Sequence, residues 1–206
     1  MRAWGEPHAR RVKLDVGVAT GPWGRRDFVE GVGLGLFACQ LGRDPKEDAP
    51  PPQKPAAKVD YALQLLKDRI ESCEPVELEA SLDGKDISGR YLLLEAVNLC
   101  YVGPSLFLAP DSKPGDGTLD VVLVSEAERD RLHEYLSRWQ DNRERLAVLP
   151  THRGKRLAMT WSGFELHIDD QLWPENGERP KEAPGAIEVR IEDACVEFLA
   201  PAAKEK

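Results

Sequence analysis

Two apolar segments, joined by a loop that ends in a Gly-Asp-Gly turn, constrain the fold of this chain more than any other feature. The first segment ends at Val97 after a run that begins at Tyr91, and the second runs from Thr118 to Val124. Both are rich in Leu and Val over about seven positions, which is typical of buried strands. Gly115-Asp116-Gly117 lies just before the second segment, where a tight turn often needs a residue with positive φ. The centre of the chain is therefore predicted to be strand, loop, turn and strand.

Alternation between apolar and polar residues predicts several further strands. Residues 12–18 alternate, and the glycine-rich residues 28–37 follow a turn-like stretch, so these two segments are expected to pair as a hairpin. Asp83-Gly84 is a strong hairpin signal, and it separates the alternating residues 76–82 from the return strand at 87–97. Additional strands are expected at residues 156–161, 163–168, 187–191 and 194–199.

Two segments have helical periodicity. Residues 59–73 place their apolar side chains on one stripe, and Ser125 with Glu128 forms a capping-box pattern before a second helix. Residues 42–57 are rich in proline and charge and are expected to form a flexible loop. Many short strands, two helices and no strand–helix–strand alternation predict a mainly β fold, an antiparallel β-sandwich or barrel with two peripheral helices. We expect residues 1–206 to form one domain.

Composition limits the class of partner and the compartment. The formal net charge is -8, with 36 acidic and 28 basic residues, which argues against nucleic acid as a partner. No apolar run approaches the roughly 18 residues that span a bilayer, and no signal peptide is visible. The four cysteines lack metal-ligand spacing and are expected to be reduced thiols with apolar neighbours. These features predict a cytoplasmic protein, with peripheral contact to the inner membrane face left open.

Three motifs have both a structural and a functional interpretation. Residues 31–35, Gly-Val-Gly-Leu-Gly, fail the dinucleotide-binding pattern and are expected to be strand glycines that allow close packing. Asp116 sits in a turn that is either structural or a site for a hard cation such as Mg²⁺. Asp169 and Asp170 either form a hairpin turn or present acid/base chemistry. His167 should face away from its apolar neighbours and make ordinary hydrogen bonds or contact solvent.

Taken in order, the segments resemble the second domain of diacylglycerol and sphingosine kinase-like lipid kinases. The resemblance spans nearly the whole chain and rests on five ordered blocks: LDVGVATG…RRDFVEGVGLGLFA, DYALQLLK, ISGRYLLLEAVNLCYVGPSLFLAPDSKPGDGTLDVVLV, FELHIDDQLWP and VEFLAP. Asn98, Gly103, Ala109-Pro110 and Asp116-Gly117 keep the family's order and spacing. The fold implied by the resemblance is a β-sandwich.

The resemblance also implies a chemistry, the phosphorylation of a lipid hydroxyl by ATP and Mg²⁺ as part of phospholipid metabolism. It places the metal-binding turn at Asp116, with backbone oxygens near Lys113 and Thr118. It places the general base in Asp169-Asp170-Gln171, where the family has Asp-Gly-Glu. The family's Glu is therefore Gln171 here, and an amide cannot accept the substrate proton. Loss of a general base costs a factor of about 10²–10⁴ in rate unless Asp170 substitutes for it.

The family's phosphate loop, GGDGT, belongs to a separate N-terminal ATP-binding domain. The Gly115-Asp116-Gly117-Thr118 of this chain leads into a strand, whereas a phosphate-binding loop opens onto a helix. We therefore expect no ATP-binding domain within the 206 residues. Two functions remain open. One is the substrate- and metal-binding half of a lipid kinase, inactive alone, that uses ATP through a separate domain. The other is a non-catalytic module that binds a lipid, such as diacylglycerol, or a protein. Self-association is also expected, because a domain without its partner exposes the surface that the partner covers.

Overall fold

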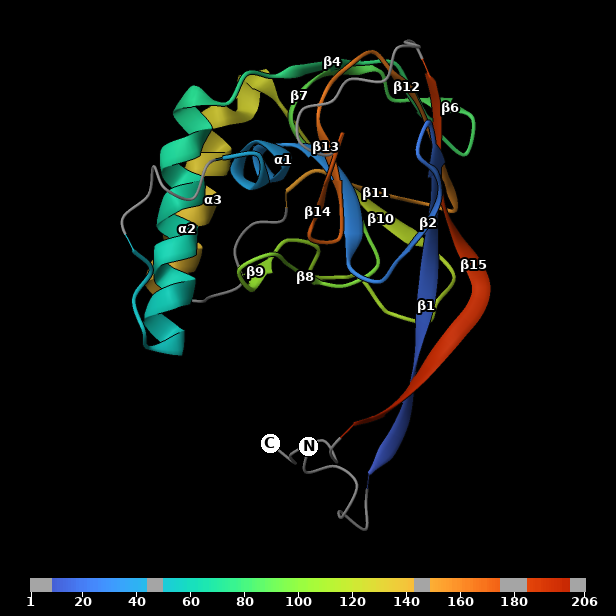
Figure 1. The fold of residues 1–206 in the computed structure, drawn as a ribbon, viewed down its shortest axis with the longest axis horizontal. Coiled ribbons are helices and arrows are strands. Elements are labelled where there is room, and N and C mark those ends of the chain that lie inside the picture. Colours follow the sequence, from blue (N-terminus) through green and yellow to red (C-terminus); the bar gives the residue numbers. More distant parts are fainter. Residues whose placement is uncertain (1–8, 44–49, 143–148, 175–184, 201–206) are drawn as a thin grey trace.

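A computed structural model describes residues 9–43, 50–142, 149–174 and 185–200, and it shows three layers (Figure 1). Two antiparallel sheets pack face to face, and helices cover the outer face of one of them. This confirms the prediction of a mainly β, antiparallel sandwich. None of the helices in the described ranges combines the length and apolar character needed to cross a bilayer.

The first sheet, sheet A, is built around a long two-stranded ribbon. Its strands occur in the order β2, β1, β15, β12, β5, β6. Their bounds are β1 Arg10–Gly21, β2 Gly24–Phe28, β5 Ala80–Leu82, β6 Lys85–Asp86, β12 Arg156–Trp161 and β15 Gly185–Ala200. Strands β1 and β15 pair from Arg10–Ala200 to Thr20–Glu188, with one irregularity between Asp15 and Val16. Their far end projects beyond the sandwich toward both termini (Figure 1).

The second sheet, sheet B, contains the central strand predicted from the apolar run. Its order is β11, β10, β7, β3, β13, β14, and β4 pairs with the start of β7. The bounds are β3 Gly31–Gly35, β4 Val76–Leu78, β7 Gly89–Val97, β10 Leu119–Ser125, β11 Thr151–Gly154, β13 Leu166–Ile168 and β14 Gln171–Trp173. A small hairpin, β8 Tyr101–Val102 with β9 Leu106–Phe107, lies between β7 and β10 in sequence. Strand β7 pairs with β10 on one side and with β3 on the other.

Within the described residues, helices α1, α2 and α3 and the 3₁₀ turn before α3 form the outer layer against sheet B (Figure 1). Helix α2, Pro55–Ser72, begins earlier than predicted, with a proline in its first turn. Helix α3, Arg129–Asn142, follows the 3₁₀ turn Glu126–Glu128, and the predicted capping box between Ser125 and Glu128 is present. Helix α1, Leu36–Leu41, was missed, because its six residues continue an apolar, glycine-rich run without a capping side chain.

The alternation of strand residues divides the apolar side chains between two cores. Val32, Leu34, Leu94 and Ile168 belong to the core between the two sheets. Leu93 and Val97 point the other way and join the core beneath the helices. Gly31, Gly33 and Gly35 occupy the positions of β3 that face the helices, so this strand has no side chains on its helix side. This bare strip of backbone leaves room for the site described below.

Several strand predictions need correction in their pairing. The predicted partner of residues 12–18 was 28–37, but β1 pairs with residues 24–28, and residues 31–35 lie in the other sheet. The predicted strand 76–82 is two strands, β4 in sheet B and β5 in sheet A. The Asp83-Gly84 hairpin is confirmed, with φ of 51° and 80°, but its return strand β6 is only two residues long. Residues 187–191 and 194–199 belong to the single strand β15.

Candidate functional site

The Gly-Asp-Gly turn before β10 is held by side chains rather than left open. Gly115 and Gly117 have φ of 87° and 72°, as expected for a tight turn. One oxygen of the Asp116 carboxylate accepts hydrogen bonds from the Thr118 amide at 3.1 Å and hydroxyl at 2.6 Å. The other oxygen is paired with the Arg153 guanidinium. Although partial burial opposes the shift, these bonds from Thr118 and Arg153 lower the pKa of Asp116.

Arg153 also contacts a second carboxylate that sequence analysis missed. Its Nε atom lies 3.2 Å from Asp120 Oδ1, and Asp120 is 2% exposed at the start of β10. Burial raises the pKa of Asp120, and Arg153 partly offsets this effect. The Oδ2 atom of Asp120 is buried without a hydrogen-bond partner among the described residues. The signal was available in the sequence, since an acidic residue inside the apolar run Leu119–Val124 is unusual in a buried strand.

These groups are the ones a cation would use at the predicted metal site. Hard cations such as Mg²⁺ take carboxylate and carbonyl oxygens, which Asp116, Asp120 and the turn backbone supply. A cation would have to displace Arg153 or share the carboxylates with it. Lys113 is exposed at the entrance to the turn. No cluster of three or more His, Cys, Asp or Glu side chains with metal-binding geometry occurs in the part of the chain that the structure describes.

The acidic pair of the second predicted site forms the turn between β13 and β14. Asp169 has a φ of 50°, and its carboxylate accepts hydrogen bonds from the backbone amides of Val29, Glu30 and Gly31, the shortest at 2.8 Å. Asp169 therefore fixes the crossing from β2 to β3. Asp170 follows in the bend, and its carboxylate makes no hydrogen bond to another described residue. Gln171 begins β14 and is exposed.

Asn98 links the two predicted sites. Its side-chain amide donates to the carbonyl of Asp15 at 2.8 Å and to the carbonyl of Val29 at 3.1 Å. Asp15 in turn accepts a hydrogen bond from the Gly117 amide at 2.7 Å through its carboxylate. A continuous path of hydrogen bonds thus runs from the Gly-Asp-Gly turn through Asn98 to the segment held by Asp169. A substitution at one site is therefore expected to alter the geometry of the other.

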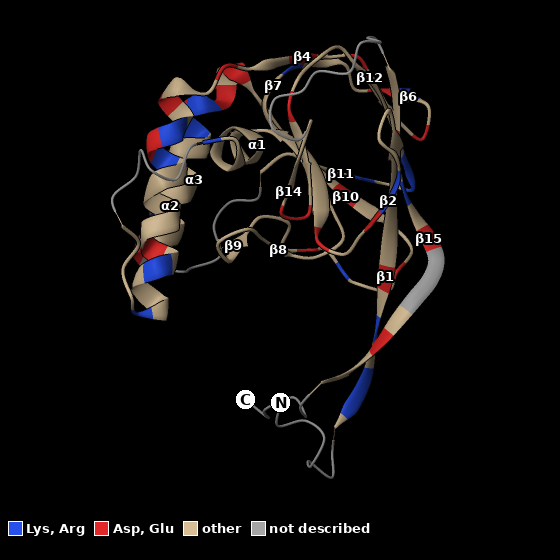
Figure 2. Cartoon of the chain, viewed as in Figure 1, with Lys and Arg blue, Asp and Glu red and all other residues tan. Residues whose placement is uncertain are grey.

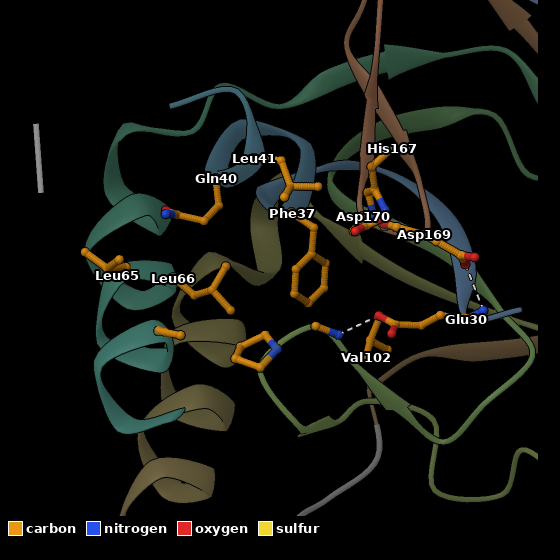
Figure 3. Close-up of a pocket in the computed structure, with 13 residues that line it drawn as sticks. Glu30, Phe37, Gln40, Leu41, Leu65, Leu66, Val102, His167, Asp169 and Asp170 are labelled. Atoms are coloured by element: carbon orange, nitrogen blue, oxygen red, sulfur yellow. Dashed lines mark hydrogen bonds between the residues drawn. The ribbon is translucent and has the colours of Figure 1, made fainter. Parts of the chain in front are cut away.

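A largely apolar cavity of about 280 Å³ opens between helices α1 and α2, the β8–β9 hairpin and the Asp169-Asp170 turn (Figure 3). Its apolar walls come from Phe37 and Leu41 of α1, Ala62, Leu65 and Leu66 of α2, and Val102 and Pro104 of the β8–β9 hairpin. The cavity is also lined by three carboxylates, those of Glu30, Asp169 and Asp170. Glu30 accepts a hydrogen bond from the Gly103 amide at 2.6 Å, and burial raises its pKa.

His167 also lines this cavity, and it forms a buried acid–base pair with Glu95 behind it. The Nε2 atom of His167 is 2.9 Å from Glu95 Oε1, and its Nδ1 atom is 2.8 Å from the carbonyl of Asp169. A carbonyl only accepts, so Nδ1 carries a proton, and a second proton is shared between Nε2 and Glu95. Gly33 makes room for the pair, since a Cβ there would lie 2.0 Å from Glu95 Oε1. As predicted, His167 faces away from Leu166 and Ile168 and makes hydrogen bonds, and it is 3% exposed.

The shared proton makes the stability of the folded protein depend on pH. Burial lowers the pKa of His167, but the charge of Glu95, the hydrogen bond to Glu95 and the hydrogen bond to the Asp169 carbonyl together raise it by more. Burial also raises the pKa of Glu95. The folded protein therefore keeps this proton above pH 6.5, where an unfolded histidine has released it. Because the folded state binds more protons in that window, its stability falls as pH rises.

We expect the free energy of unfolding in urea to decrease between pH 6.5 and 8 in the wild type. The double variant Glu95→Gln with His167→Gln keeps hydrogen-bonding groups but cannot titrate, so its stability should be flatter over the same range. The measurement is a set of urea titrations at half-unit steps of pH. Parallel curves for the two proteins would contradict the shared-proton assignment.

Substitutions at Asp169 and Asp170 can be compared to measure how much the Asp169 hydrogen bonds stabilise the fold. Asp169→Gly removes an acceptor from three backbone amides and is expected to cost about 2 kcal/mol or more of unfolding free energy. Asp170→Gly has the same entropic cost in the unfolded chain but loses no hydrogen bond to a described residue, so it should cost about 1 kcal/mol or less. Glycine also relieves the positive φ at position 169, which reduces the expected difference and does not create it. Chemical denaturation of both variants checks the difference. Equal losses would show that Asp169 does not hold the Val29–Gly31 turn.

Comparison with known proteins supports the sandwich assignment. The family model described as YegS C-terminal NAD kinase beta sandwich-like domain matches residues 48–191. A solved diacylglycerol kinase from Bacillus anthracis str. Sterne has a TM-score of 0.52 and 18% identity, covering 93% of this chain and 55% of that chain. A candidate diacylglycerol kinase from the same strain has a TM-score of 0.51 and 21% identity, covering 86% and 51%.

The likeness to these solved structures shows the fold, and the chain spans about half of their length. No curated protein matches the sequence at a significant level. The family model, in contrast, covers more than half of the chain and includes strands of both sheets, the cavity helix α2 and the two predicted sites. The chain therefore belongs to the family of the YegS C-terminal NAD kinase beta sandwich-like domain.

Proposed function

We propose that this chain is the lipid-binding half of an ATP-dependent lipid kinase and works with a nucleotide-binding domain. The observation that carries the proposal is the apolar cavity between α1, α2 and sheet B, which has carboxylates at one side. Apolar walls with a few polar groups are typical of sites that hold an acyl chain and orient its head group. Diacylglycerol or a related lipid, carrying one free hydroxyl, fits this arrangement.

The polar groups of the cavity have distinct tasks in this proposal. Gln40 also lines the cavity, and its Oε1 atom is buried with no partner among the described residues, so a ligand hydroxyl would satisfy it. Asp170 replaces the family's Glu as the group that accepts the proton of the lipid hydroxyl, because Gln171 has no basic atom. Asp169 and Glu30 position this region, since both are engaged with backbone amides. Mg²⁺ and ATP would supply the charge stabilisation and the transferred phosphoryl group.

The projecting ribbon supports the need for a further domain. Beyond the sandwich, β15 exposes Val196, Phe198 and Leu199, which are 43%, 49% and 43% accessible. The paired part of β1 carries the exposed basic residues Arg10, Arg11 and Lys13 (Figure 2). Adjacent apolar and charged positions of this kind suit a docking surface. A nucleotide-binding domain, on the same or on another polypeptide, is the partner we propose for it, with a second copy of this chain as the competing occupant.

A specific observation favours the alternative, a non-catalytic lipid-binding module. Gln171 stands at the position of the base, and Arg153 occupies the carboxylates of the metal turn. Both proposals predict lipid binding, but only the first predicts phosphoryl transfer when a nucleotide-binding domain is added. In both cases the isolated chain, supplied with ATP, Mg²⁺ and diacylglycerol in detergent micelles, should give no phosphorylated lipid. Turnover by the isolated chain would overturn this part of the proposal.

Filling the cavity tests where the lipid binds. Ala62→Trp places an indole between α2 and the cavity, and it should weaken the binding of a fluorescent diacylglycerol analogue by about tenfold or more. Ala56→Trp adds the same side chain on an exposed position of the same helix and serves as the control. Fluorescence titration of both variants gives the dissociation constants. Equal weakening by both variants, or no weakening by either, would remove the cavity from the proposal.

The metal turn makes a separate prediction. Because Arg153 neutralises Asp116 and Asp120, Arg153→Ala should raise the affinity for Mg²⁺, and the added change Asp116→Asn should abolish the gain. Arg156→Ala removes an exposed arginine paired with Glu188 in sheet A and is the matched control. Isothermal titration with MgCl₂ measures the effect. Identical affinities in the wild type and Arg153→Ala would argue that the turn is purely structural.

A further inference from the structure

Two of the cysteines predicted to be reduced thiols lie in contact. Cys39 is on α1 and Cys73 ends α2, and their Sγ atoms are 2.9 Å apart although 34 positions separate them in the sequence. Both are free thiols. A disulfide requires about 2.0 Å between sulfur atoms, so a movement of roughly 1 Å would close the bond. This contact joins the two helices that form the walls of the cavity.

The two thiols differ in access and reactivity. Cys73 is 2% exposed, whereas Cys39 is half-buried and lines a second cavity of about 210 Å³ with Gly35, Ala38 and Glu165. The hydrogen bond from Cys73 lowers the pKa of Cys39, against the opposing effect of burial, and the same contact together with burial raises the pKa of Cys73. The thiolate is the form that reacts with oxidants. Cys39 is therefore the thiol that a small molecule reaches first, and Cys73 is the one placed to resolve the product.

We propose that Cys39 and Cys73 form a redox-active dithiol, which a hydroperoxide converts into a disulfide between α1 and α2. In the first step the Cys39 thiolate attacks the peroxide, the O–O bond breaks, and an alcohol or water leaves while Cys39 becomes a sulfenic acid. In the second step the Cys73 sulfur displaces the sulfenic oxygen, which leaves as water with the Cys73 proton. Two thiols are oxidised and one peroxide is reduced. A dithiol reductant such as reduced thioredoxin would reverse the reaction.

The disulfide would act on the cavity, a consequence that rests on the proposed lipid-binding function. Helix α1 supplies Phe37, Gln40 and Leu41 to the wall, and α2 supplies Ala62, Leu65 and Leu66. In this proposal an acyl chain enters between these helices, and its entry is faster when they can separate slightly. A covalent bond at one end of α2 restricts that separation. Oxidation is therefore expected to slow the uptake of lipid without removing any group that contacts it.

The test begins with the covalent product. The folded protein is treated with equimolar hydrogen peroxide, free thiols are alkylated, and peptides are identified by mass spectrometry. We expect a linked Cys39–Cys73 peptide in the wild type and in Cys100→Ser, none in Cys39→Ser, and a dimedone-trapped sulfenic acid on Cys39 in Cys73→Ser. When the protein is oxidised in guanidinium, the Cys39–Cys73 disulfide should no longer be favoured over other pairings. Linkage at other cysteines, or irreversible oxidation without linkage, would overturn the proposal.

Thermal stability then tests the disulfide, and the rate of lipid uptake tests its effect on the cavity. The oxidised wild type should melt about 5–10 °C higher than the reduced protein, because the bond closes a long loop, and Cys39→Ser should show no shift. Stopped-flow mixing with a fluorescent diacylglycerol analogue should show slower association after oxidation, reversed by reductant. Equal rates in both states would refute control of the cavity. If the reduced protein binds no lipid, the proposed lipid-binding function is wrong. The linked peptide and the shift in melting temperature still test whether Cys39 and Cys73 form a disulfide.

Discussion

The crossing of the chain from one sheet to the other at Val29–Gly31 is the constraint on which the candidate site depends. Strand β2 ends at Phe28 in sheet A and β3 begins at Gly31 in sheet B, so the amides of Val29, Glu30 and Gly31 lie at the crossing. The Asp169 carboxylate accepts from all three amides, and Asn98 holds the adjoining carbonyl of Val29. Buried backbone groups need such partners, so these two side chains make the crossing stable. The same crossing brings Glu30 to the cavity.

The glycines of β3 serve a second purpose beyond close packing. Without a side chain at Gly33, the helix side of this strand accommodates Glu95, which forms with His167 a polar pair inside an otherwise apolar layer. A buried carboxylate is costly unless it shares a proton or a charge, and the imidazole supplies both. Both nitrogens of His167 are engaged, so the pair supports the Asp169-Asp170 turn rather than presenting a free base to a ligand.

Sequence analysis predicted the fold class and most elements because alternation, turn residues and helix caps are local signals. The Asp83-Gly84 hairpin, the Ser125–Glu128 capping box and the Asp169-Asp170 turn are all present. The errors fall where the chain changes sheets, at residues 28–31 and 78–80. A strand that crosses between sheets keeps its alternation, so no local pattern marks the crossing. Helix α1 was missed for a related reason, since six apolar residues do not distinguish a helix turn from a strand.

The sequence alone determined the family, the antiparallel sandwich and the residues that carry the two predicted sites, because these depend on ordered motifs and on periodicity. Only the tertiary structure decided what those residues contact. Asp116 pairs with Arg153 across 37 positions, Asp169 binds amides about 140 positions away, and Cys39 meets Cys73. Contacts at such separations arise from packing between layers, which composition and spacing do not encode. The central strands and the Gly-Asp-Gly turn therefore identify the fold, while the surrounding partners set the chemistry that the turn and the cavity can support.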